Sequence, residues 1–319
     1  MAILLLTGNY MIKKYYILLL MLSISMRVIA QQDPMYSQYI FNGLLINPAY
    51  AGTHEVLNAT MLYRNQWINI PGAPKTGIFS IDSPVSNQKI GLGLNVSFDK
   101  IGITSHTAIT SIYAYKLRFS ESSLTFGIQA GVGFFFSNNT SVKTDNTQID
   151  AAFQTDYKET LPNFGVGMYY QANRFFAGFS IPQMLGPEIH QAIYGNQQND
   201  LNLVLVNHYF LSSGYLFDLN PDLKFQFSTL LKFVDGAPIE GDLNGILWFS
   251  DSVAFGLSYR SEASVGVLGQ IKINKQLFLG YAYEYSTTQL NNFTSGSHEI
   301  VLRYQFDFSR GKISTPRFF

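Results

Sequence analysis

A strict alternation of apolar and polar residues is the dominant pattern along this chain. Between positions 90 and 99, Ile90, Leu92, Leu94, Val96 and Phe98 alternate with Gly91, Gly93, Asn95, Ser97 and Asp99. Successive side chains of a β-strand point to opposite faces, so the segment predicts a strand with one apolar and one small or polar face. The pattern returns in residues 125–134, 253–260, 277–284 and 299–308. The chain is therefore predicted to be all-β.

About fourteen candidate strands follow from the same pattern, each of roughly 8 to 14 residues, which suits a tilted barrel strand. They are expected to begin near Leu57, Thr76, Ile90, Ser105, Ser123, Leu161, Arg174, Asn202, Asp222, Gly241, Ser252, Ala263, Gln276 and Ser297. No internal repeat of the kind that marks a solenoid or a propeller accompanies them. One large β-structure is expected.

The connections between these strands alternate in length, which decides the kind of β-structure. Short turns cover residues 86–89, 120–122, 172–173, 218–221, 250–251 and 274–275, and longer connections cover 68–75, 137–160, 182–201, 234–240 and 287–296. Outer-membrane barrels have short periplasmic turns and longer extracellular loops, whereas a soluble sandwich has no reason for this order. The connections near Ile101 and Ser261 are short exceptions. We predict a transmembrane antiparallel β-barrel over residues 57–308, a tail at 309–319, and, from the even strand number, both termini in the periplasm.

Composition agrees with a membrane barrel and excludes several other classes. Charged residues make up 13% of the chain and aromatic residues 15%, whereas an average soluble domain has about 25% charged residues. The formal net charge is zero, so nucleic acid is not an expected partner. The chain has no cysteine, which excludes disulfides and thiolate metal sites.

Residues 1–30 are predicted to be a cleaved signal peptide. Lys13 and Lys14 form a basic start, residues 15–26 an apolar stretch, and residues 28–30 a small-residue cleavage site. The apolar stretch is shorter than the roughly 20 residues that a membrane-spanning helix needs. Met1 and Met11 both remain as candidate initiators.

Residues 31–56 precede the first strand and break its periodicity. Pro34 and Pro48 interrupt regular structure, yet the segment carries many apolar side chains: Met35, Tyr36, Tyr39, Ile40, Phe41, Leu44, Leu45 and Ile46. A free tail would not be so apolar, so burial is expected. Two interpretations stay open: a plug in the barrel or in a partner, and a short packed helix that closes the periplasmic end for stability alone.

The same segment carries a family resemblance. The blocks Gln32-Asp33-Pro34, Tyr36-Ser37-Gln38-Tyr39, Phe41-Asn42 and Asn47-Pro48-Ala49-Tyr50-Ala51-Gly52, followed by Tyr63-Arg64-Asn65-Gln66-Trp67 and residues 71–76, resemble the start of mature PorP/SprF proteins. The resemblance implies an outer-membrane barrel of the type IX secretion and gliding machinery of Bacteroidota. It also implies partners: other components of that machinery, and large surface proteins such as adhesins that members help to reach or stay on the cell surface. Candidate docking residues are Asp33, Pro34, Tyr36, Gln38, Tyr39, Asn42, Asn47, Pro48, Ala49, Tyr50, Gly52, Arg64, Gln66 and Trp67.

Catalytic and metal-binding patterns are weak throughout the chain. The histidines, which are His54, His106, His190, His208 and His298, form no metal-type pair and adjoin no nucleophile motif. Acidic residues of the longest loop, Asp145, Asp150, Asp156 and Glu159, lack the spacing of a calcium loop. We therefore expect no enzyme activity, no cofactor and no metal site.

Charged residues within the strands are expected to face the lumen, because charge on the lipid face costs a few kcal/mol. The charged residues are Arg64, Asp99, Arg260, Glu284, Glu299, Arg303 and Asp307, and the polar Gln66 is expected to face the lumen with them. They either pair across the lumen and stiffen the barrel or line a path. Two function classes remain: a non-enzymatic secretion or anchoring component, favoured by the family resemblance alone, and a channel or transporter for small solutes.

Overall fold

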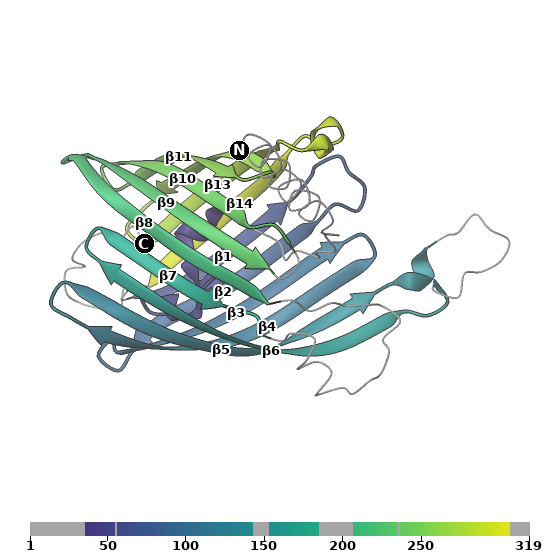
Figure 1. Cartoon of the computed structure of the whole chain (residues 1–319), viewed down its shortest axis with the longest axis horizontal. Coiled ribbons are helices and arrows are strands. Elements are labelled where there is room, and N and C mark those ends of the chain that lie inside the picture. Colours follow the sequence, from purple (N-terminus) through teal and green to yellow (C-terminus); the bar gives the residue numbers. More distant parts are fainter. Residues whose placement is uncertain (1–35, 55, 143–152, 185–206, 235–236, 307–319) are drawn as a thin grey trace, which may run out of the picture.

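The computed structural model describes residues 36–54, 56–142, 153–184, 207–234 and 237–306, and its strands form one closed barrel (Figure 1). The strands are β1 (Leu57–Asn65), β2 (Lys75–Val85), β3 (Ile90–Ile101), β4 (Thr104–Arg118), β5 (Ser122–Ser137), β6 (Tyr157–Ala172), β7 (Phe175–Ile181), β8 (His208–Asn220), β9 (Leu223–Val234), β10 (Glu240–Phe249), β11 (Val253–Arg260), β12 (Ser264–Lys272), β13 (Leu277–Ser286) and β14 (Ser297–Phe306).

Every strand pairs antiparallel with its neighbours in sequence, and β1 closes the barrel by pairing with β14. Leu57 lies opposite Phe306 and Asn65 opposite His298, so the closing pair is in register over the whole of β1. This confirms the predicted antiparallel barrel of fourteen strands. Within the described ranges the only helices are short 3-10 turns, and none is long and apolar enough to cross a membrane.

The two ends of the barrel differ in the length of their connections. At one end, called the short-turn end, the turns are residues 86–89, 119–121, 173–174, 221–222, 250–252 and 273–276. The opposite, long-loop end carries the connections after β1, β5, β7, β9 and β13, together with the short β3–β4 and β11–β12 connections that the sequence showed as exceptions. All but two of the expected strand starts lie within one residue of the observed ones. β6 begins at Tyr157 rather than Leu161, and the expected start at Asn202 lies outside the described residues.

Strand lengths vary around the barrel. β4, β5 and β6 have 15, 16 and 16 residues, whereas β11 and β12 have 8 and 9. The long strands extend past the rest of the wall at the long-loop end (Figure 1). At the start of β6, exposed Lys158 and Thr160 replace the apolar outer residues found farther along the strand. This projecting part carries polar side chains on its outer face.

The two faces of the wall follow the alternation in the sequence. Outward positions are exposed and apolar, as at Leu92, Phe98, Ile128 and Leu257. Inward positions are buried and mostly polar or small; examples are Ser80, Gln226, Ser228, Asn244 and Ala282. An outer face that suits lipid and an inner face that suits hydrogen bonding are the expected design of a membrane barrel.

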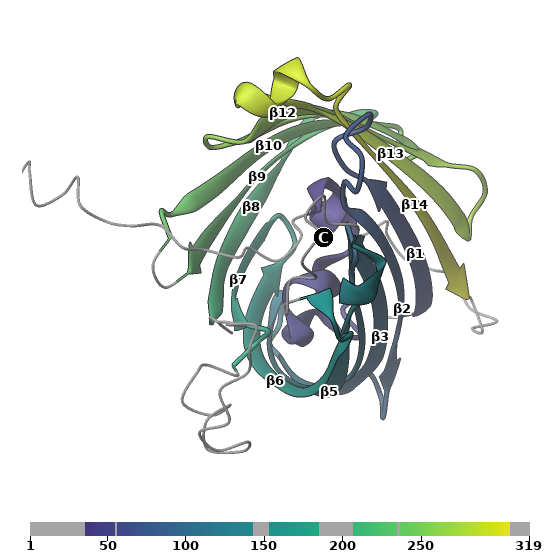
Figure 2. The ribbon, with the colours of Figure 1, turned by 90° about the vertical axis from the view of Figure 1, so that its right-hand side faces the viewer.

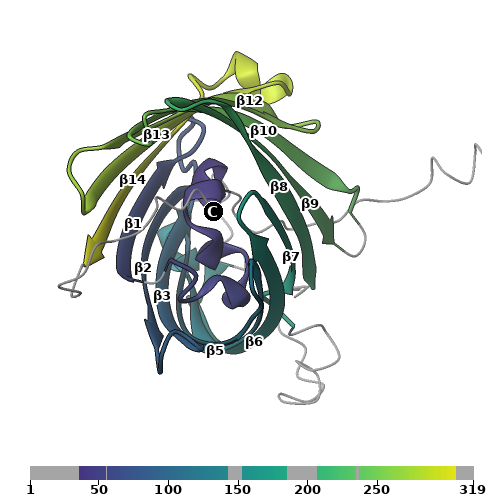
Figure 3. The same ribbon diagram turned by 90° about the vertical axis from the view of Figure 1, so that its left-hand side faces the viewer.

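The lumen holds residues 36–54, here called the N-terminal segment (Figures 2 and 3). It consists of three 3-10 turns, η1 (Ser37–Phe41), η2 (Gly43–Leu45) and η3 (Pro48–Tyr50). Pro48 stands at the first position of η3, where its missing N–H costs nothing, and the Asn47 side chain caps that turn by accepting from Ala49 N–H at 2.9 Å. Pro48 and the Asn47 cap start a new turn at this point, so the segment is divided into short turns and does not form a continuous α-helix.

Candidate functional site

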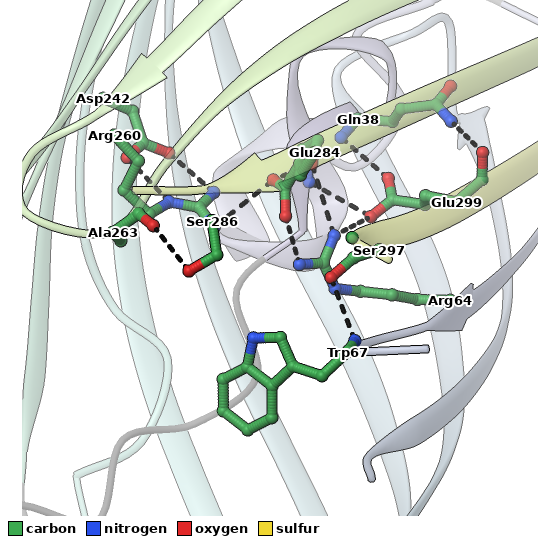
Figure 4. A network of polar contacts seen from close by, with 12 residues as sticks. Gln38, Arg64, Trp67, Asp242, Arg260, Ala263, Glu284, Ser286, Ser297 and Glu299 are labelled. Atoms are coloured by element: carbon green, nitrogen blue, oxygen red, sulfur yellow. Dashed lines mark hydrogen bonds and ion pairs between the residues drawn. The ribbon is translucent and has the colours of Figure 1, made fainter. Parts of the chain in front are cut away.

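The first turn of the N-terminal segment lies beside a buried carboxylate. Glu299 on β14 is 1% exposed, and it accepts hydrogen bonds from the backbone N–H groups of Ser37 at 3.1 Å and Gln38 at 2.8 Å (Figure 4). The Gln38 side chain donates to the Glu299 backbone carbonyl at 3.2 Å. Backbone donors that meet a carboxylate form strong, charge-assisted bonds. The first turn of the segment is therefore tied to the strand that closes the barrel.

Arg64 on β1 links the same carboxylate to a second one. Its guanidinium lies 3.1 Å from Glu299 and also pairs with Glu284 on β13, which in turn accepts from the Ser37 hydroxyl. We call Ser37, Gln38, Arg64, Glu284 and Glu299 the latch. All its side chains are buried, so its charges are little screened by water.

A second arginine extends the latch along the inner wall. Arg260 on β11 donates to both oxygens of Asp242 on β10 at 2.9 Å and reaches Glu284 at 3.5 Å (Figure 4). Glu240 lies 3.6 Å from the same guanidinium. Two arginines thus face four carboxylates at this place. Buried carboxylates need hydrogen-bond donors or opposite charges around them. The hydroxyl and N–H groups of the N-terminal segment therefore donate hydrogen bonds to carboxylate oxygens that the two arginines alone do not satisfy.

The middle of the segment is held by apolar contact and by single hydrogen bonds to the wall. Asn244 donates to the Tyr39 hydroxyl at 2.8 Å, and Asn42 donates to the Ser80 hydroxyl at 2.8 Å. Burial raises the pKa of Tyr39. Tyr39, Ile40, Phe41 and Leu44 pack in one cluster with inward side chains, among them Leu230, Ile246, Trp248, Leu268 and Ala282. Burial of such side chains contributes about 1.5–3 kcal/mol each.

The third turn lies directly on the backbone of the wall. Asn47 donates to the carbonyl oxygens of Met168 at 3.0 Å and Phe179 at 3.4 Å. At Gly127 on β5, an added Cβ would lie 2.2 Å from the Ala49 nitrogen and 2.4 Å from the Pro48 carbonyl carbon. Glycine is therefore required at this position if the segment is to approach so closely.

The segment leaves the lumen at the short-turn end through Gly52. This residue has φ +70°, donates its N–H to Asp82 on β2 at 2.8 Å, and accepts from the Lys116 ammonium at 2.9 Å. An added Cβ on the neighbouring Gly91 would lie 2.0 Å from the Ala51 carbonyl oxygen. Tyr50, whose pKa is also raised by burial, packs edge-on against Tyr169. The chain then turns into β1.

Most of the candidate docking residues face the barrel's own interior. Those that lie buried or half-buried in the lumen are Tyr36, Gln38, Tyr39, Asn42, Asn47, Pro48, Ala49, Tyr50, Gly52 and Arg64. Gln66 and Trp67 instead lie in the β1–β2 loop, where their N–H groups donate to the Pro74 carbonyl at 3.0 Å and the Ser297 hydroxyl at 3.2 Å. Asp33 and Pro34 lie outside the described residues.

The charged residues expected in the lumen divide into separate groups. Arg64, Arg260, Glu284 and Glu299 meet in one network, so they pair rather than line a path. Arg303 lies apart and donates to the Phe41 carbonyl at 3.0 Å, Asp99 accepts from Thr76, and Asp307 lies outside the described residues. Sequence reasoning missed Asp82, Lys116, Glu240 and Asp242. Their places at inward-facing positions of the alternating pattern in β2, β4 and β10 would have identified them.

The described residues contain no group of three or more His, Asp or Glu side chains arranged to hold a metal ion. The ring of His54 packs edge-on against the ring of Tyr50, and His298 contacts the Tyr281 hydroxyl on the outer wall. Asp156 caps the projecting β5–β6 hairpin by accepting from the Thr140 N–H at 3.0 Å and its hydroxyl at 2.8 Å, and these bonds lower its pKa. His190, Asp145 and Asp150 lie outside the described residues.

Comparison with known proteins assigns the chain to one family. The model for type IX secretion system membrane protein PorP/SprF matches residues 28–304. No curated protein matches the chain. Solved structures that resemble it include the Acinetobacter baumannii outer membrane protein Omp33, at 9% identity over 79% of this chain and 98% of that one, with a TM-score of 0.47. A Pseudomonas aeruginosa FadL homologue matches at 13% identity over 90% and 97%, with a TM-score of 0.41. The KdgM porin matches at 10% identity over 78% and 99%, with a TM-score of 0.36.

Proposed function

The chain belongs to the PorP/SprF family of type IX secretion system outer-membrane proteins, and from this premise we propose that it assists the secretion or surface anchoring of particular large surface proteins, such as adhesins. In this role it is non-enzymatic and binds protein partners: other components of the secretion machinery and the protein that it serves. The adhesin-like cargo comes from the family resemblance and not from any contact in the barrel.

One observation carries the choice of a protein-handling role over a solute channel. The N-terminal segment occupies the lumen and is tied to the wall at both ends, through Glu299 near the long-loop end and Asp82 near the short-turn end. A solute path would have to pass this segment or displace it. A barrel that binds its own chain in this way is better suited to a scaffold than to an open pore.

The structure also guides where partners would dock. The buried members of the candidate docking set contact the wall, so we propose that they hold the segment in the lumen. Gln66 and Trp67 lie in a loop of the long-loop end and are only half-buried, so they are the members available to a partner. We propose that the β1–β2 loop is a docking surface for the secreted protein.

Orientation in the membrane follows from loop length. We propose that the short turns face the periplasm, so that β14, which ends at Phe306 on that side, directs the C-terminal tail there. Strand parity places the start of β1 at the same side. The parity of the strands does not determine the side on which the mature N-terminus lies. The N-terminal segment passes through the lumen before β1, and its first residue, Tyr36, lies in the half of the barrel nearer the long loops.

Gene deletion tests the function. We expect a strain without this chain to lose specific proteins from its surface proteome, while uptake of small solutes is unchanged. Complementation with the Trp67→Ala variant should restore less of the cargo than complementation with Phe119→Ala, which removes an exposed aromatic side chain from a short turn. An intact surface proteome together with reduced uptake of a small solute would show that the secretion role is wrong.

A further inference from the structure

Two lysines face each other on the outer wall near the long-loop end. Lys75 on β2 lies directly opposite Lys100 on β3, and both are exposed. Their neighbours Thr76 and Asp99 point into the lumen and hydrogen-bond to each other, so the two ammonium groups point outward. Cβ atoms of directly opposite residues are only about 4.5–5.5 Å apart.

This lysine pair has no counter-charge of its own. Neither Lys75 nor Lys100 forms an ion pair within the part of the chain that the structure describes. The residues next to them in the same cross-strand row are Asn65 on β1 and Ser105 on β4, neither of which is acidic. Like charges placed opposite each other destabilise a sheet, so the pair is unfavourable until an anion joins it.

An apolar slot lies directly below the lysine pair, one step closer to the middle of the membrane. Gly77 on β2 pairs with Tyr63 on β1 and with Phe98 on β3, and these two aromatic side chains are 50% and 47% exposed. A Cβ added to Gly77 would meet no atom within 4 Å. The outer wall therefore has a gap one side chain wide between two rings of the aromatic girdle.

From this arrangement we propose that the outer wall binds a phosphorylated lipid of the leaflet at the long-loop end. The phosphate of the head group lies between Lys75 and Lys100, and one acyl chain lies in the slot at Gly77, between Tyr63 and Phe98. Two ammonium groups suit a doubly charged phosphate, and their height just above the apolar belt is the height of lipid head groups. A soluble anion would use the lysines but not the slot.

The site can be tested on the purified full-length protein. After removal of bound lipid, native mass spectrometry would follow the binding of bisphosphorylated lipid A. Each lysine near a charged head group is worth about fivefold in binding, so Lys75→Gln/Lys100→Gln is expected to weaken binding roughly 10- to 30-fold. The control Lys89→Gln/Lys275→Gln removes the same charge from exposed turns at the opposite end and should leave binding unchanged.

A second variant tests the slot separately. Gly77→Leu fills the gap without touching the lumen, and it should weaken lipid binding severalfold while the heat-modifiable migration of a folded barrel is retained. Equal lipid binding by the wild type and the double lysine variant would overturn the proposal. Displacement of the lipid by excess inorganic phosphate, together with unchanged binding by Gly77→Leu, would overturn it as well, because the site would then bind any soluble anion.

Discussion

Glu299→Gln removes one charge from the latch and leaves the size of the side chain unchanged. In the wild type, Glu299 accepts from the N–H groups of Ser37 and Gln38 and pairs with Arg64. The amide has one acceptor oxygen instead of two, and that oxygen is neutral. The first turn of the N-terminal segment should therefore open more often, while the third turn stays in place.

The magnitude follows from the bonds that change. A hydrogen bond to a charged group contributes about 1.5–3 kcal/mol and a neutral one about 0.5–1.5 kcal/mol, so each of the two backbone bonds weakens by about 1 kcal/mol or is lost. The expected total is about 2–3 kcal/mol for opening of the first turn. Since about 1.4 kcal/mol corresponds to a factor of ten, the open population rises about 30- to 150-fold.

Hydrogen–deuterium exchange measures this opening directly. Peptides that cover residues 36–41 should exchange about 30- to 150-fold faster in Glu299→Gln, whereas peptides that cover residues 47–50, held by Asn47 and Gly127, should not change. The control Glu121→Gln removes an exposed carboxylate from the β4–β5 turn and should have no effect. Unchanged exchange at residues 36–41, or an equal increase along the whole segment, would refute the role of Glu299.

Further predictions concern the wall, the projecting hairpin and the lumen. Gly127→Val should displace η3 and speed proteolysis of the N-terminal segment, while Gly269→Val, whose Cβ would meet nothing closer than 3.9 Å, should not; equal cleavage of both would contradict the close packing. Hydrogen bonds from Thr140 lower the pKa of Asp156, so these bonds should be fully formed at any pH above the ordinary pKa of an aspartate. They should be lost only as the pH falls through the lowered pKa of Asp156. Exchange of the Thr140 amide should follow that pH dependence, which Asp156→Asn should abolish. Tyr39→Phe loses one hydrogen bond from Asn244, so its unfolding free energy in a denaturant titration should fall by about 1 kcal/mol; a much larger loss would indicate that the ring had moved.

Local patterns in the sequence predict the barrel well, because strand alternation and turn length are local properties. The alternation from Ile90 to Asp99 became β3, and the six turns that the sequence predicted as short all lie at one end, although the short β3–β4 and β11–β12 connections lie at the other. The start of β6 was misjudged because the rule assumes lipid outside the wall. Lys158 and Thr160 lie on the projecting part of the strand, where polar outer residues break the expected pattern.

The path of the N-terminal segment could not be predicted in the same way. Its contacts join residues far apart in sequence; Ser37 and Glu299, for example, are 262 positions apart. Apolar composition and the prolines at positions 34 and 48 indicate that residues 31–56 are buried and irregular, but they do not say which part of the wall the segment meets. The family resemblance marked the residues, and the geometry shows that most of them contact their own barrel.

Conductance of the purified full-length protein in planar lipid bilayers tests most directly whether the N-terminal segment fills the lumen. The N-terminal segment is tied to Glu299 near one end of the lumen and to Asp82 near the other, so the wild type should show no steady, porin-like conductance. Gly127→Val, which displaces the segment, should open a measurable conductance. A steady, porin-like conductance in the wild type, unchanged in Gly127→Val, would contradict the occupied lumen and favour a channel for small solutes.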